Sequence, residues 1–169
     1  MKLNKIIAVA SGLLIIATSV GMSGTAEAKW RRMTADAVCH GNPGAGYDIG
    51  SGSNSIGIEA LGSSAFATCW LPSDSYFNHI DINKVNVHMD RNTADYAYWH
   101  TGARVCVKDY SSDSYSCGQR ISPPNTLGEH TLTFTGVYLN SLTAYSAWGP
   151  YVGVTLYGAD KVRFLYVTE

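Results

Sequence analysis

The stretch Val85-Asn86-Val87-His88-Met89-Asp90 decides the fold class. Apolar and polar side chains alternate along it, and successive side chains of a β-strand point to opposite faces of a sheet. We therefore expect one face of this segment in the core and the other, which carries His88, in water. The same alternation recurs elsewhere along the chain, in the segments 55–60, 103–108, 131–135 and 151–157.

Turn-forming Gly, Ser, Asp and Pro residues separate these short segments. No sustained helical period interrupts the pattern, although apolar residues spaced three apart within 137–148 leave one short helix open. Ile80 and Ile82 lie in the opposite phase to Val85, which predicts a β-bulge near 83–84. Many short strands joined by turns are typical of a sandwich. We predict a single all-β domain over residues 29–169, an antiparallel β-sandwich of jelly-roll type.

The first 28 residues have the three parts of a signal peptide. Lys2 and Lys5 precede an apolar run over 6–20, and small residues then lead to Ala26-Glu27-Ala28, an A-x-A cleavage site. The apolar run is short for a membrane span, and no second run follows it. We predict a signal peptide over 1–28, a secreted or periplasmic protein, and no transmembrane segment after cleavage.

Four cysteines, an even number, predict two disulfides in an exported chain. Sequence alone allows three pairings, and we expect Cys39–Cys69 and Cys106–Cys117. The reason is local: a turn-rich segment, 109–114, separates two strand-like segments, and folding back at 111–112 places Cys106 opposite Cys117. A zinc site is the competing interpretation, but the chain has no C-x-x-C pair and its cysteine spacings are irregular.

Composition and motifs give little support to catalysis or to nucleic-acid binding. Only 15% of the residues are charged and the formal net charge is −1, so the chain lacks the basic footprint of a nucleic-acid-binding protein. It has no G-x-S-x-G nucleophile motif. The pairs His79–Asp81 and His88–Asp90 each offer an imidazole and a carboxylate, yet no further metal ligand is indicated, and a solvent-facing strand explains His88. We assign no catalytic residue, metal or cofactor.

Aromatic residues are the most informative remaining feature. Trp70, Phe134 and Phe164 are expected in the core, because they lie in apolar or alternating strands. The others that fall in the outward phase or in loops form a candidate ligand platform: Tyr96, Tyr98, His100, Trp148, Tyr151 and Tyr157. An exposed ring can stack on the apolar face of a sugar without any charge. The low charge therefore favours a non-catalytic carbohydrate-binding module for a neutral glycan.

Two other functions stay open on the same residues. A surface rich in Tyr, Ser, Gly and Asn is also typical of protein-binding sites, which would fit a cell-envelope, structural or protein-interaction protein. A small secreted hydrolase is the third, because the members of a catalytic triad need not be close in sequence.

The segment Cys69–Phe77, CWLPSDSYF, and the later Val85–His88 resemble a group of short exported bacterial proteins. That group has a signal peptide, about the same length and cysteines in similar places, and no established activity. The resemblance covers most of residues 29–169. It implies an exported, disulfide-bonded bacterial protein and transfers no functional residue.

Overall fold

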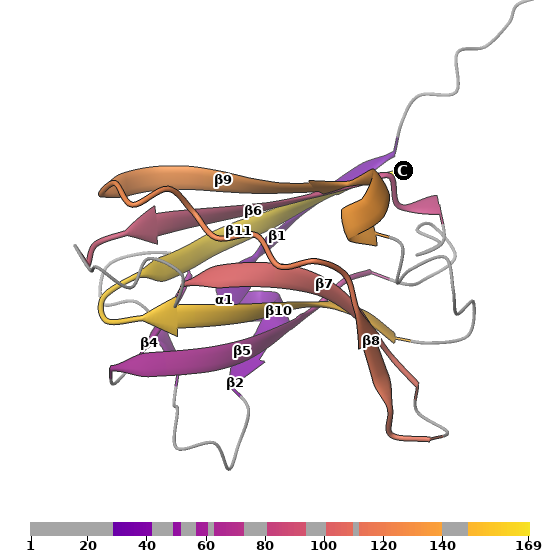
Figure 1. Cartoon of the computed structure of the whole chain (residues 1–169), viewed down its shortest axis with the longest axis horizontal. Helices are drawn as coiled ribbons and strands as arrows, with labels where there is room; N and C mark the ends of the chain where they lie inside the picture. The colour runs from indigo at the N-terminus through magenta and orange to yellow at the C-terminus, as the bar shows by residue number, and fades with distance from the viewer. Residues whose placement is uncertain are drawn as a thin grey trace, which may run out of the picture.

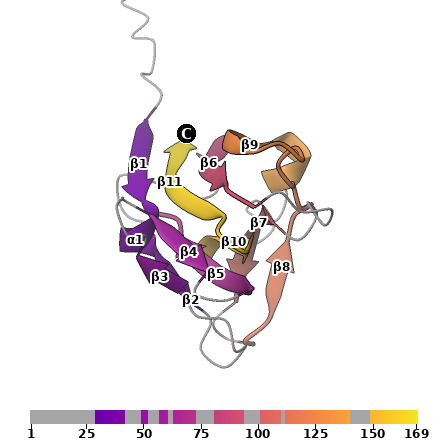
Figure 2. The ribbon, with the colours of Figure 1, turned by 90° about the vertical axis from the view of Figure 1, so that its left-hand side faces the viewer.

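The computed structural model describes residues 29–41, 49–51, 57–60, 63–72, 81–93, 101–109, 112–139 and 149–169 (Figure 1). The predicted signal peptide over 1–28 lies outside this part of the chain. Two antiparallel sheets face each other, and Figure 2 views the two layers from one end of the sandwich.

The first sheet, sheet A, has the order β3-β4-β11-β6-β9, and β1 also pairs with β11. Its strands are β1 (Trp30–Thr34), β3 (Ile49–Ser51), β4 (Ile58–Ala60), β6 (Lys84–Arg91), β9 (Gly128–Thr135) and β11 (Lys161–Thr168). The second, sheet B, has the order β2-β5-β10-β7-β8. Its strands are β2 (Cys39–Gly41), β5 (Ser64–Trp70), β7 (Gly102–Lys108), β8 (Tyr115–Cys117) and β10 (Gly149–Tyr157).

The strand order is that of a jelly roll. Counting β1 and β5 to β11 as eight strands, sheet A runs first, eighth, third, sixth, and sheet B runs second, seventh, fourth, fifth. This order places two Greek keys around one core, as in double-sheet jelly rolls. It confirms the predicted antiparallel sandwich of jelly-roll type. In the described part of the chain the helical pieces are short: α1 (Ala35–Val38) and a 3₁₀ turn, η2 (Gly136–Leu139). The turn lies at the start of the ambiguous segment 137–148, whose remainder after Leu139 lies outside the described residues.

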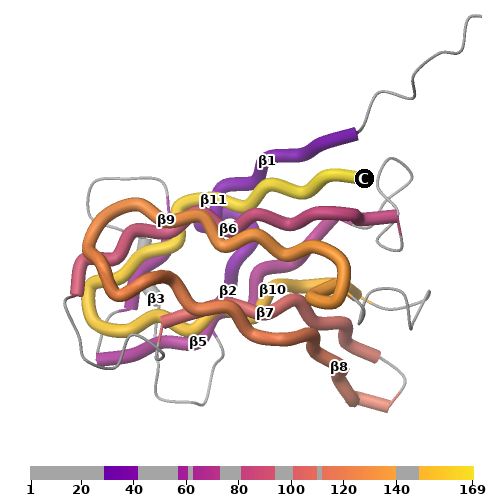
Figure 3. The backbone as a smooth tube through the Cα atoms, turned by 45° about the horizontal axis from the view of Figure 1, so that its top comes forward, coloured from indigo at the N-terminus to yellow at the C-terminus, as the bar shows by residue number. Residues whose placement is uncertain are grey.

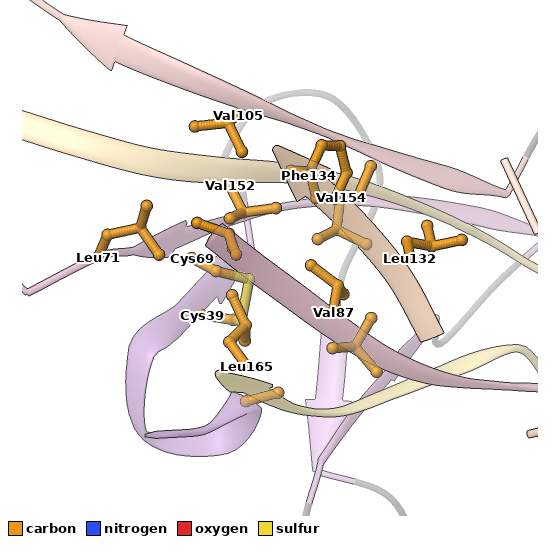
Figure 4. Packing of buried hydrophobic residues seen from close by; sticks show 14 of the residues in the cluster. Cys39, Cys69, Leu71, Val87, Val105, Leu132, Phe134, Val152, Val154 and Leu165 are labelled. Atoms are coloured by element: carbon orange, nitrogen blue, oxygen red, sulfur yellow. A yellow bond between two sulfur atoms is a disulfide. The ribbon is translucent and has the colours of Figure 1, made fainter. Parts of the chain in front are cut away.

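The core lies between the inner faces of the two sheets. Val85, Val87 and Met89 of β6 point into it, as the alternation predicts, and all three are buried. The Cys39–Cys69 disulfide lies within the same cluster, close to Val152 and Leu165 (Figure 4). Both predicted disulfides are present, and the register of β7 with β8 sets Cys106 opposite Cys117.

Two expectations about individual residues are wrong, and so is the expected position of a bulge. Trp70 and Phe164 are only half-buried and lie on outer faces, whereas Phe134 is in the core. Each lies in the phase opposite to a buried neighbour, Cys69 or Leu165. The expected bulge is also misplaced. Strand β6 begins at Lys84, after Ile82, and the register shift lies instead on β11, between Val162 and Phe164.

A buried ion pair ties one end of the sandwich together. The Arg91 side chain is 2% exposed and that of Asp160 1%, with Arg91 Nε 3.6 Å from Asp160 Oδ2. The Arg91 guanidinium donates to the carbonyl oxygens of Pro124 and Thr93, at 2.9 and 3.1 Å. Asp160 accepts the Thr93 N–H at 3.0 Å and the Thr101 hydroxyl at 2.6 Å. The pair therefore joins the end of β6 to the β10–β11 turn.

Candidate functional site

The outer face of sheet B carries a row of large side chains on its two central strands. In β5 the small residues Ala65, Ala67 and Cys69 point into the core, so Phe66 and Trp70 point outward. In β10 Val152, Val154 and Leu156 point inward, and their neighbours Tyr151, Gly153, Thr155 and Tyr157 point outward. The pairing of β5 with β10 therefore gathers aromatic rings on one surface.

Tyr151 lies directly opposite Trp70, and their ring centroids are 5.5 Å apart at an interplanar angle of 60°. Gly153 follows on the same face, opposite Thr68. A Cβ atom on Gly153 would lie 3.2 Å from Cζ of Phe66 and 3.7 Å from Cε2 of Tyr151. The glycine thus lets both rings approach the backbone, which is one reason for a glycine within a strand.

The surface over these strands is hollowed at two adjoining places. One hollow, of about 450 Å³, is lined by Ser64, Phe66, Arg104, Arg120, Gly153, Thr155 and Tyr157. The other, of about 480 Å³, is lined by His40, Gly41, Phe66, Thr68, Trp70, Arg104, Lys108, Asp113, Tyr115 and Tyr151. Because Phe66 and Arg104 line both, the two hollows form one groove. We call it the sheet-B groove, its first half the Arg120 end and its second half the Trp70 end.

Positive side chains lie along the groove. The pKa of the Arg120 guanidinium is lowered, first by burial and then by repulsion from Arg104. Burial raises the pKa of the Tyr151 hydroxyl, and the positive charges of Arg104 and Lys108 oppose this effect. At the Trp70 end Lys108 Nζ is 2.7 Å from the exposed Asp113 carboxylate. The Arg120 end has two arginines, and its described lining residues include no aspartate or glutamate.

The β7–β8 hairpin forms one wall of the Trp70 end. The hairpin bends away from sheet A (Figure 1), and Tyr115 of β8 is exposed beside Lys108. Asp113, in the turn, has a φ of 53°, which aspartate tolerates better than most residues. The Cys106–Cys117 disulfide joins β8 to β7. This wall therefore depends on one short strand and one cross-link.

The outer face of sheet A carries a second aromatic group. His88 lies between Phe164 and Tyr166, with ring centroids 4.4 and 5.3 Å away, and the Arg32 guanidinium lies 4.3 Å from the Phe164 centroid. The pKa of His88 is lowered by burial and then by Arg32, an effect that Glu129 opposes. Trp30 is 66% exposed at the edge of this group.

A hollow of about 350 Å³ adjoins this aromatic group. Its arginine, Arg163, already pairs with Asp90 and Glu129, at 2.5 and 3.1 Å. The positive charge in this hollow is therefore neutralised by two carboxylates of the same sheet.

The candidate platform is only partly described. Tyr151 and Tyr157 both lie along the sheet-B groove, one at each end. Tyr96, Tyr98, His100 and Trp148 lie outside the described residues, and their part in the platform stays a prediction. Sequence reasoning missed the other main groove residues: Phe66, Trp70, Tyr115, Arg104 and Arg120. The small inward residues of β5 were the signal that Phe66 and Trp70 point outward.

His88 lies on the outer face of sheet A, as predicted, with its Nδ1 3.0 Å from the Thr131 hydroxyl, but its side chain is half-buried. Within the described ranges, no group of three or more His, Cys, Asp or Glu side chains could hold a metal ion. His79, of the other His-x-Asp pair, lies outside them. No helix in the described part of the chain is both long and apolar enough to cross a membrane.

No family model and no curated protein matches the sequence. Solved structures of carbohydrate-binding modules are similar in part. A family 29 module variant complexed with cellulohexaose has a TM-score of 0.48 and 11% identity, covering 85% of this chain and 92% of that chain. A variant of the same module complexed with mannohexaose has a TM-score of 0.48 and 10% identity, covering 84% and 92%.

The C-terminal family 6 module of a marine laminarinase from Zobellia galactanivorans has a TM-score of 0.42 and 9% identity, covering 83% of this chain and 100% of that chain. The strand order by itself is that of a jelly roll, and the hollows over β5 and β10 define the candidate site.

Proposed function

We propose that this is an exported, non-catalytic carbohydrate-binding protein that holds a glycan chain in the sheet-B groove. The observation that carries the proposal is the aromatic floor, in which Trp70, Tyr151 and Phe66 lie on adjacent strands of one open groove. The faces of pyranose rings carry C–H groups, which pack well on the negative face of an aromatic ring. Two disulfides fit an extracellular setting.

The shape and the polar groups of the groove fit the same ligand. Each half has a volume within the range of about 300–1,000 Å³ usual for small-ligand sites, at about 450 and 480 Å³. Hydroxyl groups of Ser64, Thr68 and Thr155 line the groove beside the rings and can bond sugar hydroxyls.

The test is a titration of residues 29–169 against a panel of soluble glycans, read by calorimetry and by affinity electrophoresis. We expect Trp70→Ala and Tyr151→Ala each to weaken binding about tenfold or more, because each removes a large apolar contact. Trp30→Ala is the matched control, since Trp30 is exposed on the other sheet. Binding by no glycan of the panel, or equal losses from Trp30→Ala and Trp70→Ala, would contradict the proposal.

A further inference from the structure

We propose that the outer face of sheet A binds a second copy of this chain, so that two molecules associate face to face through it. The proposal concerns the sheet opposite to the groove and goes beyond glycan binding. Three observations carry it: the aromatic side chains at the centre of this face, the opposite charges at its two ends, and its area.

The register of sheet A determines which side chains share this face. Val85, Val87 and Leu165 are buried in the core, so their neighbours in β6 and β11 point outward. The strand pairings then give three rows of side chains across β1, β11, β6 and β9, which lie side by side in Figure 3. The rows are Trp30–Thr168–Lys84–Thr135, Arg32–Tyr166–Asn86–Thr133 and Thr34–Phe164–His88–Thr131.

Aromatic side chains occupy the centre of the face and one of its corners. His88 lies 4.4 Å from Phe164 and 5.3 Å from Tyr166, between ring centroids. The centroid of Trp30 is 6.4 Å from that of Tyr166, and Trp30 is 66% exposed. Arg32, beside these rings, is exposed as well. Trp, Tyr and Arg are the residue types most enriched in protein–protein interfaces.

The two ends of the face carry opposite charges. The end with Trp30 also has Lys84 and Arg32, which give it two positive charges. Among the described residues, the opposite end carries three acidic and two basic side chains, which leave one negative charge: Glu59, Asp90, Glu129, Lys161 and Arg163. The side chain of Glu129 is 77% exposed, so a second molecule can reach it.

A twofold axis between two copies makes these ends meet. If the axis runs across the strands, it reverses the order of the rows, and Lys84 of each copy lies over Asp90 and Glu129 of the other. The row of Trp30 then lies over the end of the other copy that has the hollow of about 350 Å³. A neutral glycan would use only the aromatic rings of this face, whereas a second copy also matches its charges.

The area of the face suits a weak and specific contact. Strands β6, β9 and β11 are each eight residues long. Four strands about 4.8 Å apart, with eight residues of about 3.3 Å each, cover about 500 Å². Two copies would bury about 1,000 Å² in total, the lower limit for a specific interface. We therefore expect a reversible dimer with a dissociation constant of roughly 10–100 μM.

Sedimentation equilibrium of residues 29–169 tests the association, at concentrations from about 1 μM to about 1 mM. We expect monomers at the low end of this range and dimers at the high end. Trp30→Ala should raise the dissociation constant about tenfold or more, because Trp side chains dominate the binding energy of such contacts. Trp70→Ala, the same substitution on sheet B, is the matched control and should change it by less than about twofold.

Charge reversal tests whether the partner is a second copy in this orientation. Lys84→Glu and Glu129→Lys should each weaken self-association about tenfold or more, because like charges then face each other twice. An equimolar mixture of the two variants should associate again, since each reversed side chain meets its opposite in the other protein. Lys108→Glu, a reversal of the same kind on sheet B, is the control and should leave self-association intact. Circular dichroism checks that each variant is folded.

Several outcomes would overturn the proposal. One is a protein that stays monomeric up to about 1 mM, and another is a dimer that Trp30→Ala leaves unchanged. A mixture of the two charge variants that associates no better than either variant alone would overturn it as well. The groove lies on the opposite sheet, so the affinity for a short soluble glycan should be the same in monomer and dimer. Failure of the dimer therefore leaves the proposed function in place.

Discussion

Gly153 is the residue on which the groove floor depends. It lies in the middle of β10, the central strand of sheet B, where most side chains would pack better than a glycine. Because glycine has no Cβ atom, the rings of Phe66 and Tyr151 can both pack against the backbone at this position. The groove thus gains a continuous apolar floor at a site where glycine weakens the strand.

Gly153→Ala is expected to impair ligand binding more than stability. The new Cβ atom must displace Cζ of Phe66 by a few tenths of an ångström, which a half-buried ring can accommodate. We expect the free energy of unfolding to change by less than about 1 kcal/mol, because the better strand propensity offsets the contact. Glycan affinity should fall several-fold.

Urea denaturation and calorimetric titration of the same sample measure the two effects. Thr133→Ala, on the exposed outer face of sheet A, controls for an alanine in a strand. Loss of several kcal/mol of stability with unchanged affinity would show that Gly153 serves packing and not the floor.

The short strand β8 forms part of the wall at the Trp70 end of the groove. It pairs with β7 over three residues, and the Cys106–Cys117 disulfide joins the pair at one end of that register. The other disulfide, Cys39–Cys69, lies inside the core and joins β2 to β5. One disulfide therefore holds the groove wall and the other holds the core, although each closes a loop in the unfolded chain.

Removal of either disulfide is expected to lower the stability, whereas removal of only one of them should weaken glycan binding. Replacing Cys106 and Cys117 together by Ala should cost about 3 kcal/mol, and replacing Cys39 and Cys69 about 3.5 kcal/mol, on the loop-entropy model. Only the first change frees β8, so only it should weaken glycan binding, because Tyr115 and Asp113 then leave the wall. Thermal unfolding and titration of both double variants provide the comparison. Equal losses of affinity in both would contradict this division.

Predictions from the sequence were correct where they depended on residues close together in the chain. The turn at 109–114 and the strand-like segments on each side of it predicted the Cys106–Cys117 pairing, and the register confirms it. Alternation predicted which residues of β6 face the core. It failed for Trp70 because a period of two defines two faces of a strand but does not say which is buried. There the small inward residues Ala65 and Ala67 decide the face.

At the scale of the whole molecule, the site could not be predicted because its parts come from distant segments. Phe66, Arg104 and Gly153 meet only through the jelly-roll order β5-β10-β7, which sequence patterns did not determine. Arg120 lies outside any strand and reaches the groove through the path of the chain after β8. The low overall charge also concealed the local pair of arginines, because net charge averages over both sheets.

The buried Arg91–Asp160 pair is a feature of the whole molecule, since its bonds link the end of β6, Thr101, Pro124 and the β10–β11 turn. Arg91→Met is expected to lower the free energy of unfolding by about 3 kcal/mol or more, because it leaves the Asp160 charge buried beside fewer partners. Arg163→Met removes a half-exposed pair on sheet A and should cost at most about 1 kcal/mol. Urea denaturation of both variants tests this order, and similar losses for the two would contradict it.

The pairing of β1 with β11 has a mechanical consequence. Trp30 lies opposite Thr168, the Glu169 N–H donates to the Lys29 carbonyl at 3.0 Å, and the side chains of Lys29 and Glu169 form an ion pair (Figure 3). Residues 29 and 169 thus meet at one corner. A force that pulls residues 29 and 169 apart would be perpendicular to strands β1 and β11. The hydrogen bonds between the two strands would therefore break one after another, starting from that corner. Pulled at these two residues, the sandwich would begin to unfold at low force from that corner.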